Sequence, residues 1–132
     1  ASLGAELLHQ REVVIDVLKR SGPAERRPVD QPERIALMLK HANLFVTARR
    51  GGRLVGIARS LSDFTYCCYL SDLAVDRACQ RQGIGRTLIE KTREAAGPGS
   101  MVLLLSAPAA MGYYPRIGMP KIDNAFMFER RR

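Results

Sequence analysis

Long apolar stretches are absent from this sequence of 132 residues. Because no run is long enough to span a bilayer and no signal peptide is visible, we expect no membrane attachment. Cysteine is scarce as well, with only Cys67, Cys68 and Cys79. An odd count that includes two adjacent cysteines argues against a disulfide framework, so the sequence favours a reducing, cytoplasmic location.

Histidine is rarer still, since His9 and His41 are the only two. No spacing of histidine and cysteine is typical of a metal site, so no metal is predicted. Neither histidine is close in sequence to Cys67 or Cys68. We therefore interpret these two cysteines as small, buried side chains of a strand rather than as nucleophiles. Internal repeats are absent too, which suits one domain over residues 1–132.

Acidic residues are in the minority: 13 stand against 21 Lys and Arg, for a net charge of +8. This balance suits an anionic ligand or weak, nonspecific binding of nucleic acid. The positive residues are spread along the chain without the interleaved aromatics of a single-strand platform. We attribute much of the excess to solubility, and a small basic nucleic-acid-binding domain stays a less favoured alternative.

The apolar periodicity predicts an α/β protein with a mixed sheet. In chain order, the predicted elements are helices at 5–20 and 30–41, strands at 44–48, 54–61 and 65–75, a helix ending near Ala96, a strand at 101–105, a short helix at 107–114 and a final strand around 125–128. Asp30 is the expected cap of the second helix. The strand at 101–105 is wholly apolar, as expected of a strand buried on both faces and parallel to the third strand.

Residues 69–90 carry the most informative pattern in the chain. An apolar strand ends at Val75, a polar loop follows, and Gly83-Ile84-Gly85 opens a helix. This order gathers free backbone N–H groups at a helix N-terminus, which suits a pyrophosphate. The run is not a P-loop, and Leu88 stands where a dinucleotide-binding fingerprint would have its third glycine.

Two segments resemble motifs of the GNAT acetyltransferase superfamily. Gln80-Arg81-Gln82-Gly83-Ile84-Gly85, following Leu73-Ala74-Val75-Asp76, resembles its acetyl-CoA-binding motif. Residues 110–119, AMGYYPRIGM, resemble its segment A-x-x-F-Y-x-x-x-G-F, although Ala107 and Met119 replace a usual asparagine and phenylalanine. The resemblance spans about residues 10–130, with no counterpart of the family's first strand before Leu7.

The resemblance implies a mixed, mostly antiparallel sheet with a splayed parallel pair in its middle and helices on both faces. It also implies acetyl-CoA as co-substrate. The strand backbone would bind pantetheine and the acetyl oxygen, and the loop would bind the pyrophosphate. The residues that this assigns to acetyl-CoA are Leu73, Ala74, Val75, Gln80, Arg81, Gln82, Gly83, Ile84, Gly85 and Arg86.

Two side chains are candidates for the chemistry. By resemblance, Tyr114 presents its phenol to the sulfur of CoA, as a general acid if its surroundings lower its pKa and as a hydrogen-bond donor otherwise. Asp72, a carboxylate within an apolar strand, is the candidate base, directly or through water. A structural ion pair of Asp72 with Arg59 is the alternative that we slightly prefer, and Asp63 is a weaker candidate base.

The sequence thus predicts an N-acetyltransferase that moves an acetyl group from acetyl-CoA to an amine, by direct attack in a ternary complex. The alternative is a non-catalytic module that senses acyl-CoA. A small molecule or a peptide would supply the amine, whose identity the sequence does not specify. A homodimer also stays open.

Overall fold

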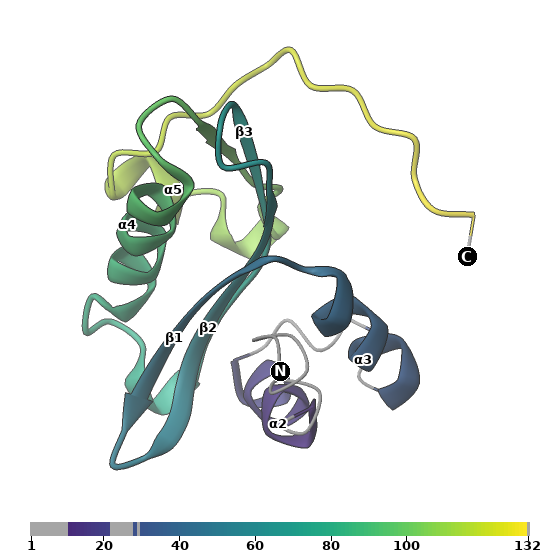
Figure 1. Cartoon of the computed structure of the whole chain (residues 1–132). Coiled ribbons are helices and arrows are strands. Elements are labelled where there is room, and N and C mark those ends of the chain that lie inside the picture. Colours follow the sequence, from purple (N-terminus) through teal and green to yellow (C-terminus); the bar gives the residue numbers. More distant parts are fainter. Residues whose placement is uncertain (1–10, 22–27, 29, 132) are drawn as a thin grey trace.

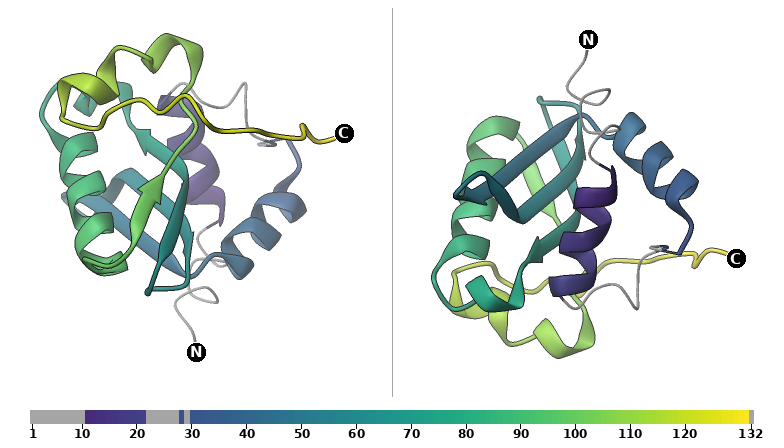
Figure 2. Two further views of the ribbon diagram at one scale, coloured as in Figure 1. Left: turned by 90° about the horizontal axis from the view of Figure 1, so that it is seen from above. Right: turned by 90° about the horizontal axis from the view of Figure 1, so that it is seen from below.

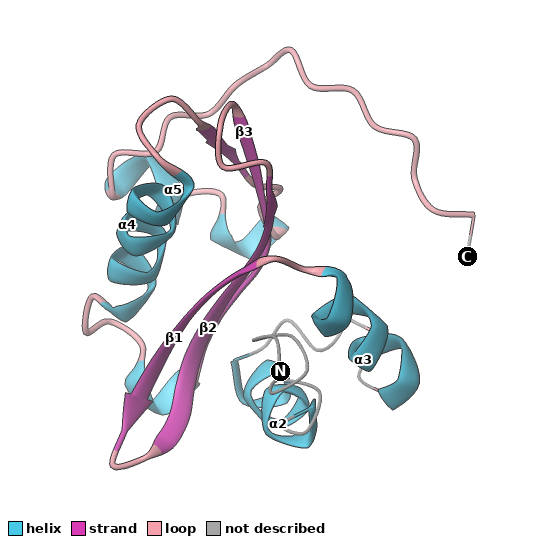
Figure 3. Ribbon diagram, in the orientation of Figure 1, coloured by secondary structure: helices cyan, strands magenta, loops and turns pink. Residues whose placement is uncertain are grey.

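The structure is a computed structural model that describes residues 11–21, 28 and 30–131. Within these residues, a four-stranded mixed sheet has helices on both faces (Figures 1 and 3). The elements are α2 (Arg11–Ser21), α3 (Pro32–His41), β1 (Leu44–Arg50), β2 (Arg53–Ser62), β3 (Cys67–Val75), α4 (Ile84–Ala96), β4 (Met101–Leu103) and α5 (Tyr113–Arg116), with short 3-10 turns at Arg77–Cys79 and Pro108–Ala110. The predicted fold class is confirmed.

Helices α2 and α3 cover one face of the sheet (Figure 2). The buried residues of this layer are Val14, Ile15, Val17, Leu18, Ile35, Leu39, Leu54, Ile57 and Ala74. The predicted first helix is present from Arg11, and its residues 5–10 lie outside the described part. The predicted cap of α3 is wrong: Gln31, not Asp30, is the N-cap residue, and it makes no side-chain capping bond.

Helix α4 covers the opposite face and buries Leu88, Ile89, Thr92 and Ala96. Its first turns lie very close to the sheet because β2 has a glycine beneath them. A Cβ atom on Gly56 would lie 3.2 Å from Cδ1 of Leu88 and 3.3 Å from Cγ2 of Ile84. Gly56 therefore sets the height of the N-terminus of α4 above the strands.

The strands form an antiparallel meander that ends in one parallel pair. β1 pairs with β2 across the turn at Gly51 and Gly52, and β2 pairs with β3. The register of the second pair shifts between Arg59 and Ser60, which leaves Ser71 as an extra, bulged residue of β3. β4 is parallel to β3 over three pairs only, from Cys67↔Met101 to Tyr69↔Leu103.

The predicted final strand around residues 125–128 is wrong, because residues 121–131 form no strand and extend away from the sheet (Figure 1). Consequently β4 is an edge strand, and the splayed parallel pair lies at the edge rather than in the middle. For the same reason β4 is not buried on both faces as predicted: Met101 is 57% exposed. The predicted helix at 107–114 is two short pieces.

Candidate functional site

Strand β3 continues well beyond its last pair with β4. That pair is Tyr69↔Leu103, whereas β3 runs on to Val75. Among the described strands, the stretch 70–75 pairs with β2 alone. The side of β3 that faces away from β2 therefore presents N–H and C=O groups that no strand uses. Leu73, Ala74 and Val75, predicted to bind pantetheine, all lie on this splayed stretch.

The loop after β3 is curved tightly and is held by its own side chains. Oδ1 of Asp76 accepts a bond of 3.0 Å from the N–H of Ala78, and Nε2 of Gln80 donates one of 2.9 Å to the carbonyl of Val75. Arg81 and Gly83 both have left-handed backbones, with φ of 66° and 82°. For a non-glycine residue this conformation costs about 1–2 kcal/mol, and such strain collects at functional sites.

The N-terminus of α4 is open. Its N-cap residue, Gly83, provides no side-chain bond, and a Cβ atom added there would meet nothing within 4 Å. The first bond along the helix runs from the N–H of Thr87 to the carbonyl of Gly83, at 3.0 Å. The N–H groups of residues 84–86 thus have no acceptor within the helix. With the helix dipole, such groups are suited to bind an anion.

Arg50, at the end of β1, also reaches this loop, which the sequence did not predict. Its Nη2 donates a bond of 2.5 Å to Oε1 of Gln82, and its Nη1 lies 3.6 Å from Sγ of Cys79. A contact across 32 residues has no local signal in the sequence. Of the predicted side-chain charges, Arg81 is exposed, whereas Nε of Arg86 donates to Glu90 at 3.1 Å.

Helix α5 brings Tyr113 against the first turn of α4. A Cβ atom on Gly85 would lie only 2.7 Å from the hydroxyl oxygen of Tyr113, so any larger residue here would require the phenol to shift. Partial burial raises the pKa of Tyr113, against the opposing charges of Arg86 and Arg116, which keeps the hydroxyl a donor. Sequence reasoning missed this residue, although the tyrosine pair and the second glycine of the motif together indicate it.

Tyr114, the predicted catalytic tyrosine, is half-buried beside Tyr113. The two rings meet edge to face with centroids 5.2 Å apart. The carbonyl of Tyr114 accepts from the N–H groups of Ile117 and Met119, which fixes the end of α5. The fold thereby brings both tyrosines to the region of the open helix N-terminus.

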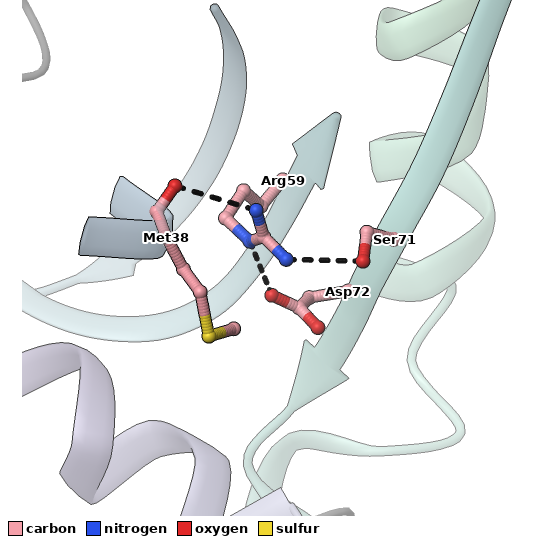
Figure 4. A network of polar contacts seen from close by, with 4 residues as sticks. All are labelled: Met38, Arg59, Ser71 and Asp72. Carbon is pink, nitrogen blue, oxygen red and sulfur yellow. Dashed lines mark hydrogen bonds and ion pairs between the residues drawn. The ribbon is translucent and has the colours of Figure 1, made fainter. Parts of the chain in front are cut away.

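Asp72 forms a buried ion pair with Arg59 on the α3 side of the sheet (Figure 4). Nε of Arg59 lies 2.5 Å from Oδ2 of Asp72, and Nη2 donates to Oγ of Ser71 at 3.0 Å. Nη1 donates to the carbonyl of Met38 in α3 at 3.4 Å. The geometry is that of the structural ion pair considered above. It crosses the bulge of β3 and joins the splayed strand to α3.

Asp63 lies in the turn at the other end of β3. Its Oδ1 accepts three backbone bonds, from the N–H groups of residues 65–67, and these lower its pKa to about 2. A carboxylate held in this way is a poor base at neutral pH. The neighbouring Cys67 is exposed, against the prediction, whereas Cys68 is buried. Partial desolvation and the Asp63 carboxylate raise the pKa of the Cys67 thiol.

Among the described residues, no helix has the length and apolar character needed to cross a membrane. Nowhere in the same residues do three or more histidine, cysteine or acidic side chains gather closely enough to hold a metal ion.

The motifs and the fold can be compared with known proteins. The sequence model of the "Acetyltransferase (GNAT) family" matches residues 11–119. The chain belongs to this family. Use of an acyl-CoA is inherent to GNAT proteins, and membership supports an acyltransferase. Neither the acyl-CoA sensor nor the nucleic-acid-binding alternative is favoured by this match.

Individual relatives of this GNAT chain agree with the family match. Serotonin N-acetyltransferase 2, chloroplastic, from Oryza sativa subsp. japonica is 29% identical over 114 residues, which are 80% of this chain and 57% of the plant protein. The chain thus spans little more than half the length of that relative.

Solved structures show the same fold at lower identity. A GNAT family acetyltransferase from Streptococcus pneumoniae TIGR4 is 22% identical, with a TM-score of 0.72 over 92% of this chain and 91% of that one. Aminoglycoside N-acetyltransferase AAC(6')-Iy, in complex with CoA, is 14% identical, with a TM-score of 0.68 over 94% and 90%.

Proposed function

We propose that this GNAT protein transfers an acetyl group from acetyl-CoA to an amine by direct attack, while both substrates are bound. One observation carries the proposal: the splayed stretch of β3 leads through the loop to the open N-terminus of α4. The pantetheine arm of CoA carries amide groups and ends in a pyrophosphate, so its groups follow the same order as these parts of the protein. Amides can bond to a free strand edge, and phosphates accept from helix N–H groups.

In this proposal the backbone of Leu73, Ala74 and Val75 holds pantetheine and polarises the acetyl carbonyl. Backbone donors aimed at a developing oxyanion contribute a few kcal/mol, about 3 or 4 for a well-placed group. The loop residues from Gln80 to Arg86 hold the pyrophosphate, through charge-assisted bonds of about 1.5–3 kcal/mol each. The hydroxyl of Tyr113, beside Gly85, is placed to add one more donor.

The transfer itself is a single displacement. The amine nitrogen attacks the carbonyl carbon, the bond from carbon to sulfur breaks, and CoA departs as a thiolate. Tyr114 gives that sulfur a proton or a hydrogen bond. The nitrogen loses a proton to water or to Asp72. Because Oδ2 of Asp72 already accepts from Arg59, the direct route requires the amine to displace Arg59, so we favour water as the first acceptor.

The acceptor is an amine of a small molecule or a peptide. The names of two relatives specify serotonin and aminoglycosides, which supports an amine as the class of acceptor. The experiment is a screen of amines, polyamines, aminoglycosides and peptides with acetyl-CoA, read by release of free thiol and by the mass of the product. Stabilisation by CoA without turnover on any amine would indicate a sensor and contradict the proposal.

Direct transfer has its own test. Intact-protein mass spectrometry without an acceptor should show no acetylated protein, and Cys67→Ala should keep kcat within about twofold, because the raised pKa of that thiol makes it a weak nucleophile. A trapped acetyl-cysteine, or loss of turnover in a folded Cys67→Ala variant, would indicate a covalent route.

A further inference from the structure

Ser71 and Asp72, two consecutive residues of β3, both direct their side chains at Arg59 of β2 (Figure 4). In a regular strand, consecutive side chains lie on opposite faces of the sheet. Here Nε of Arg59 lies 2.5 Å from Oδ2 of Asp72, while Nη2 donates to Oγ of Ser71 at 3.0 Å. The bulge explains this arrangement, because two residues of β3 stand opposite one residue of β2. Arg59 thus bonds to both residues of the bulge.

The guanidinium of Arg59 is itself held in place. The residue is only 6% exposed, and its Nη1 donates to the carbonyl of Met38, near the C-terminus of α3, at 3.4 Å. That end of a helix carries partial negative charge, which favours a cation beside it. Three partners on two elements leave the planar guanidinium, with its fixed donor directions, little freedom. Arg59 is therefore a rigid support for the bulge.

The register of β2 and β3 decides which backbone groups of the splayed stretch face away from β2. The N–H of Asp76 donates to the carbonyl of Val55 at 2.8 Å, one pair beyond Gly56↔Val75. In an antiparallel pair, both backbone groups of every second residue point to the partner strand, and those of the residues between point away. The N–H and C=O groups of Leu73 and Val75 therefore face away from β2. Of these, the groups of Leu73 lie nearer the bulge.

The direction of the Leu73 N–H depends on how Asp72 is held. This N–H belongs to the peptide unit that joins Leu73 to Asp72, and because a peptide unit is planar, a rotation at Asp72 redirects it. No second strand among the described ones supports β3 here, since its last pair with β4 is Tyr69↔Leu103. The ion pair between Asp72 and Arg59 thus restrains this peptide unit where a second neighbouring strand is missing.

We propose that Arg59 is a positioning residue for acetyl transfer, which holds the N–H of Leu73 in the direction that polarises the acetyl carbonyl. This inference rests on the proposed function, in which the backbone of β3 binds the thioester. Arg59 acts through the bulge and not on the substrates. A donor aimed at the developing oxyanion is worth about 10²–10³-fold in kcat, and a misplacement of about 1 Å costs about 10²-fold. Loss of the support should therefore lower kcat and hardly change the affinity for CoA, which depends mainly on the loop after β3.

The first experiment is steady-state kinetics on Arg59→Lys. This variant keeps a positive charge beside Asp72, so the fold should survive, but one ammonium group does not reproduce the fork of the guanidinium. We expect kcat to fall about 10–100-fold with any acceptor that works, and the Kd of CoA from calorimetry to stay within about twofold. Ser60→Ala is the matched control, because Ser60 is the next residue of β2, is wholly buried, and makes no side-chain hydrogen bond among the described residues. Its kcat should equal that of the wild type.

Infrared spectroscopy of bound acetyl-CoA distinguishes positioning from a merely structural role. With an isotope label at the acetyl carbonyl, the difference spectrum reports the polarisation of this one bond. We expect its band at lower frequency in the wild type and in Ser60→Ala than in free acetyl-CoA, and closer to the free value in Arg59→Lys. A merely structural role would lower the Tm of Arg59→Lys but leave the band of the folded protein unchanged.

A second variant covers the case in which Arg59→Lys does not fold. Arg59→Met/Asp72→Leu replaces the buried ion pair by apolar residues of similar size, which is often neutral for stability, and it also removes the restraint. The carbonyl band should move in the same direction. An unchanged band in either folded variant, or wild-type kcat in Arg59→Lys with chemistry rate-limiting, would overturn the inference and leave the proposed function intact. Failure of the wild type to bind acetyl-CoA would instead contradict the proposed function itself.

Discussion

Two loops at opposite ends of β3 each gather backbone N–H groups. One loop supplies its own side-chain acceptor for these groups, and the other does not. In the turn before β3, the carboxylate of Asp63 accepts from the N–H groups of residues 65–67. In the loop after β3, the first turn of α4 has no capping side chain. A turn with its own anion is closed, whereas a turn without one is available to the anion of a ligand.

The lowered pKa of Asp63 shows that backbone N–H groups stabilise a negative charge. The three N–H bonds lower it from 3.8 to about 2, although the carboxyl is exposed to water. The same kind of group at the start of α4 is strengthened by the helix dipole. The proposed phosphate site therefore rests on backbone N–H groups of the same kind.

The largest effect should follow from closing the open loop with an anion of its own. Gly83→Asp places a carboxylate beside the N–H groups of residues 84–86, so we expect CoA affinity to fall about 10²–10⁴-fold, the loss of two charge-assisted bonds. Calorimetry measures the affinity. Gly52→Asp is the matched control, because Gly52 has φ of 81° against 82° for Gly83 but lies in the β1–β2 turn. Unchanged affinity in a folded Gly83→Asp variant would exclude the phosphate site.

The next largest effect concerns Tyr114 in α5. Tyr114→Phe should lower kcat about 10²–10⁴-fold if the phenol is a general acid, or about tenfold if it only donates a hydrogen bond. CoA affinity should change little. Tyr66→Phe, at a 77%-exposed residue of the closed turn, is the control. Tyr113 does not serve as one, because its hydroxyl lies beside Gly85 in the first turn of α4. Wild-type kcat in Tyr114→Phe, with chemistry rate-limiting, would contradict the assignment.

A smaller effect tests the contact between α5 and α4. Gly85→Ala would place a methyl group 2.7 Å from the Tyr113 hydroxyl, so we expect CoA affinity to fall severalfold, about 1 kcal/mol. In a Tyr113→Phe background the nearest ring atom, Cζ, would be 3.6 Å away, and the same substitution should cost less. Calorimetry on the wild type, the two single variants and the double variant gives the coupling. Equal costs in both backgrounds would mean that the hydroxyl does not occupy this position.

The smallest effect should come from removing the negative charge of Asp63 in the closed turn. Asp63→Asn keeps an acceptor oxygen but removes the charge, so it should lower the free energy of unfolding at pH 7. Because the folded pKa is lowered, the stability from this charge is present above pH 3.8 and is lost as the pH falls towards about 2. Urea unfolding of both proteins along this range should show the difference shrinking. A constant difference would mean that charge is not the cause.

The sequence predicted those parts of the fold that local pattern determines. The turn at Gly51 and Gly52, the strands of the meander and the end of α4 near Ala96 follow from glycine placement and apolar spacing. The prediction of a final strand around residues 125–128 was wrong for a different reason. Phe126 and Phe128 have strand character, but pairing depends on a neighbouring strand, and no local pattern specifies where that strand lies.

Some residues of the candidate site could likewise be predicted from local sequence, whereas others could not. The loop and Gly83 could be located from their own motif, because strand, glycine and helix are adjacent in sequence. Arg50 and Tyr113 could not, since each meets the loop only through tertiary packing. Asp72 could be predicted in part. Its place in β3 and an ion pair with Arg59 were both expected from the sequence, but the contact itself forms only when β2 and β3 pair.

The brief pairing of β4 has a consequence for the local stability of the sheet. Three parallel pairs attach it to β3, and they form only after the chain has crossed over through α4. Native-state hydrogen exchange should therefore show β4 opening at low energy, before global unfolding, whereas β2, which is paired on both sides, should exchange late. β4 thus neighbours the strand that we propose binds pantetheine, and it is the part of the sheet that opens most readily. A ligand held between β3 and β4 would accordingly slow amide exchange in β4 far more than in β2.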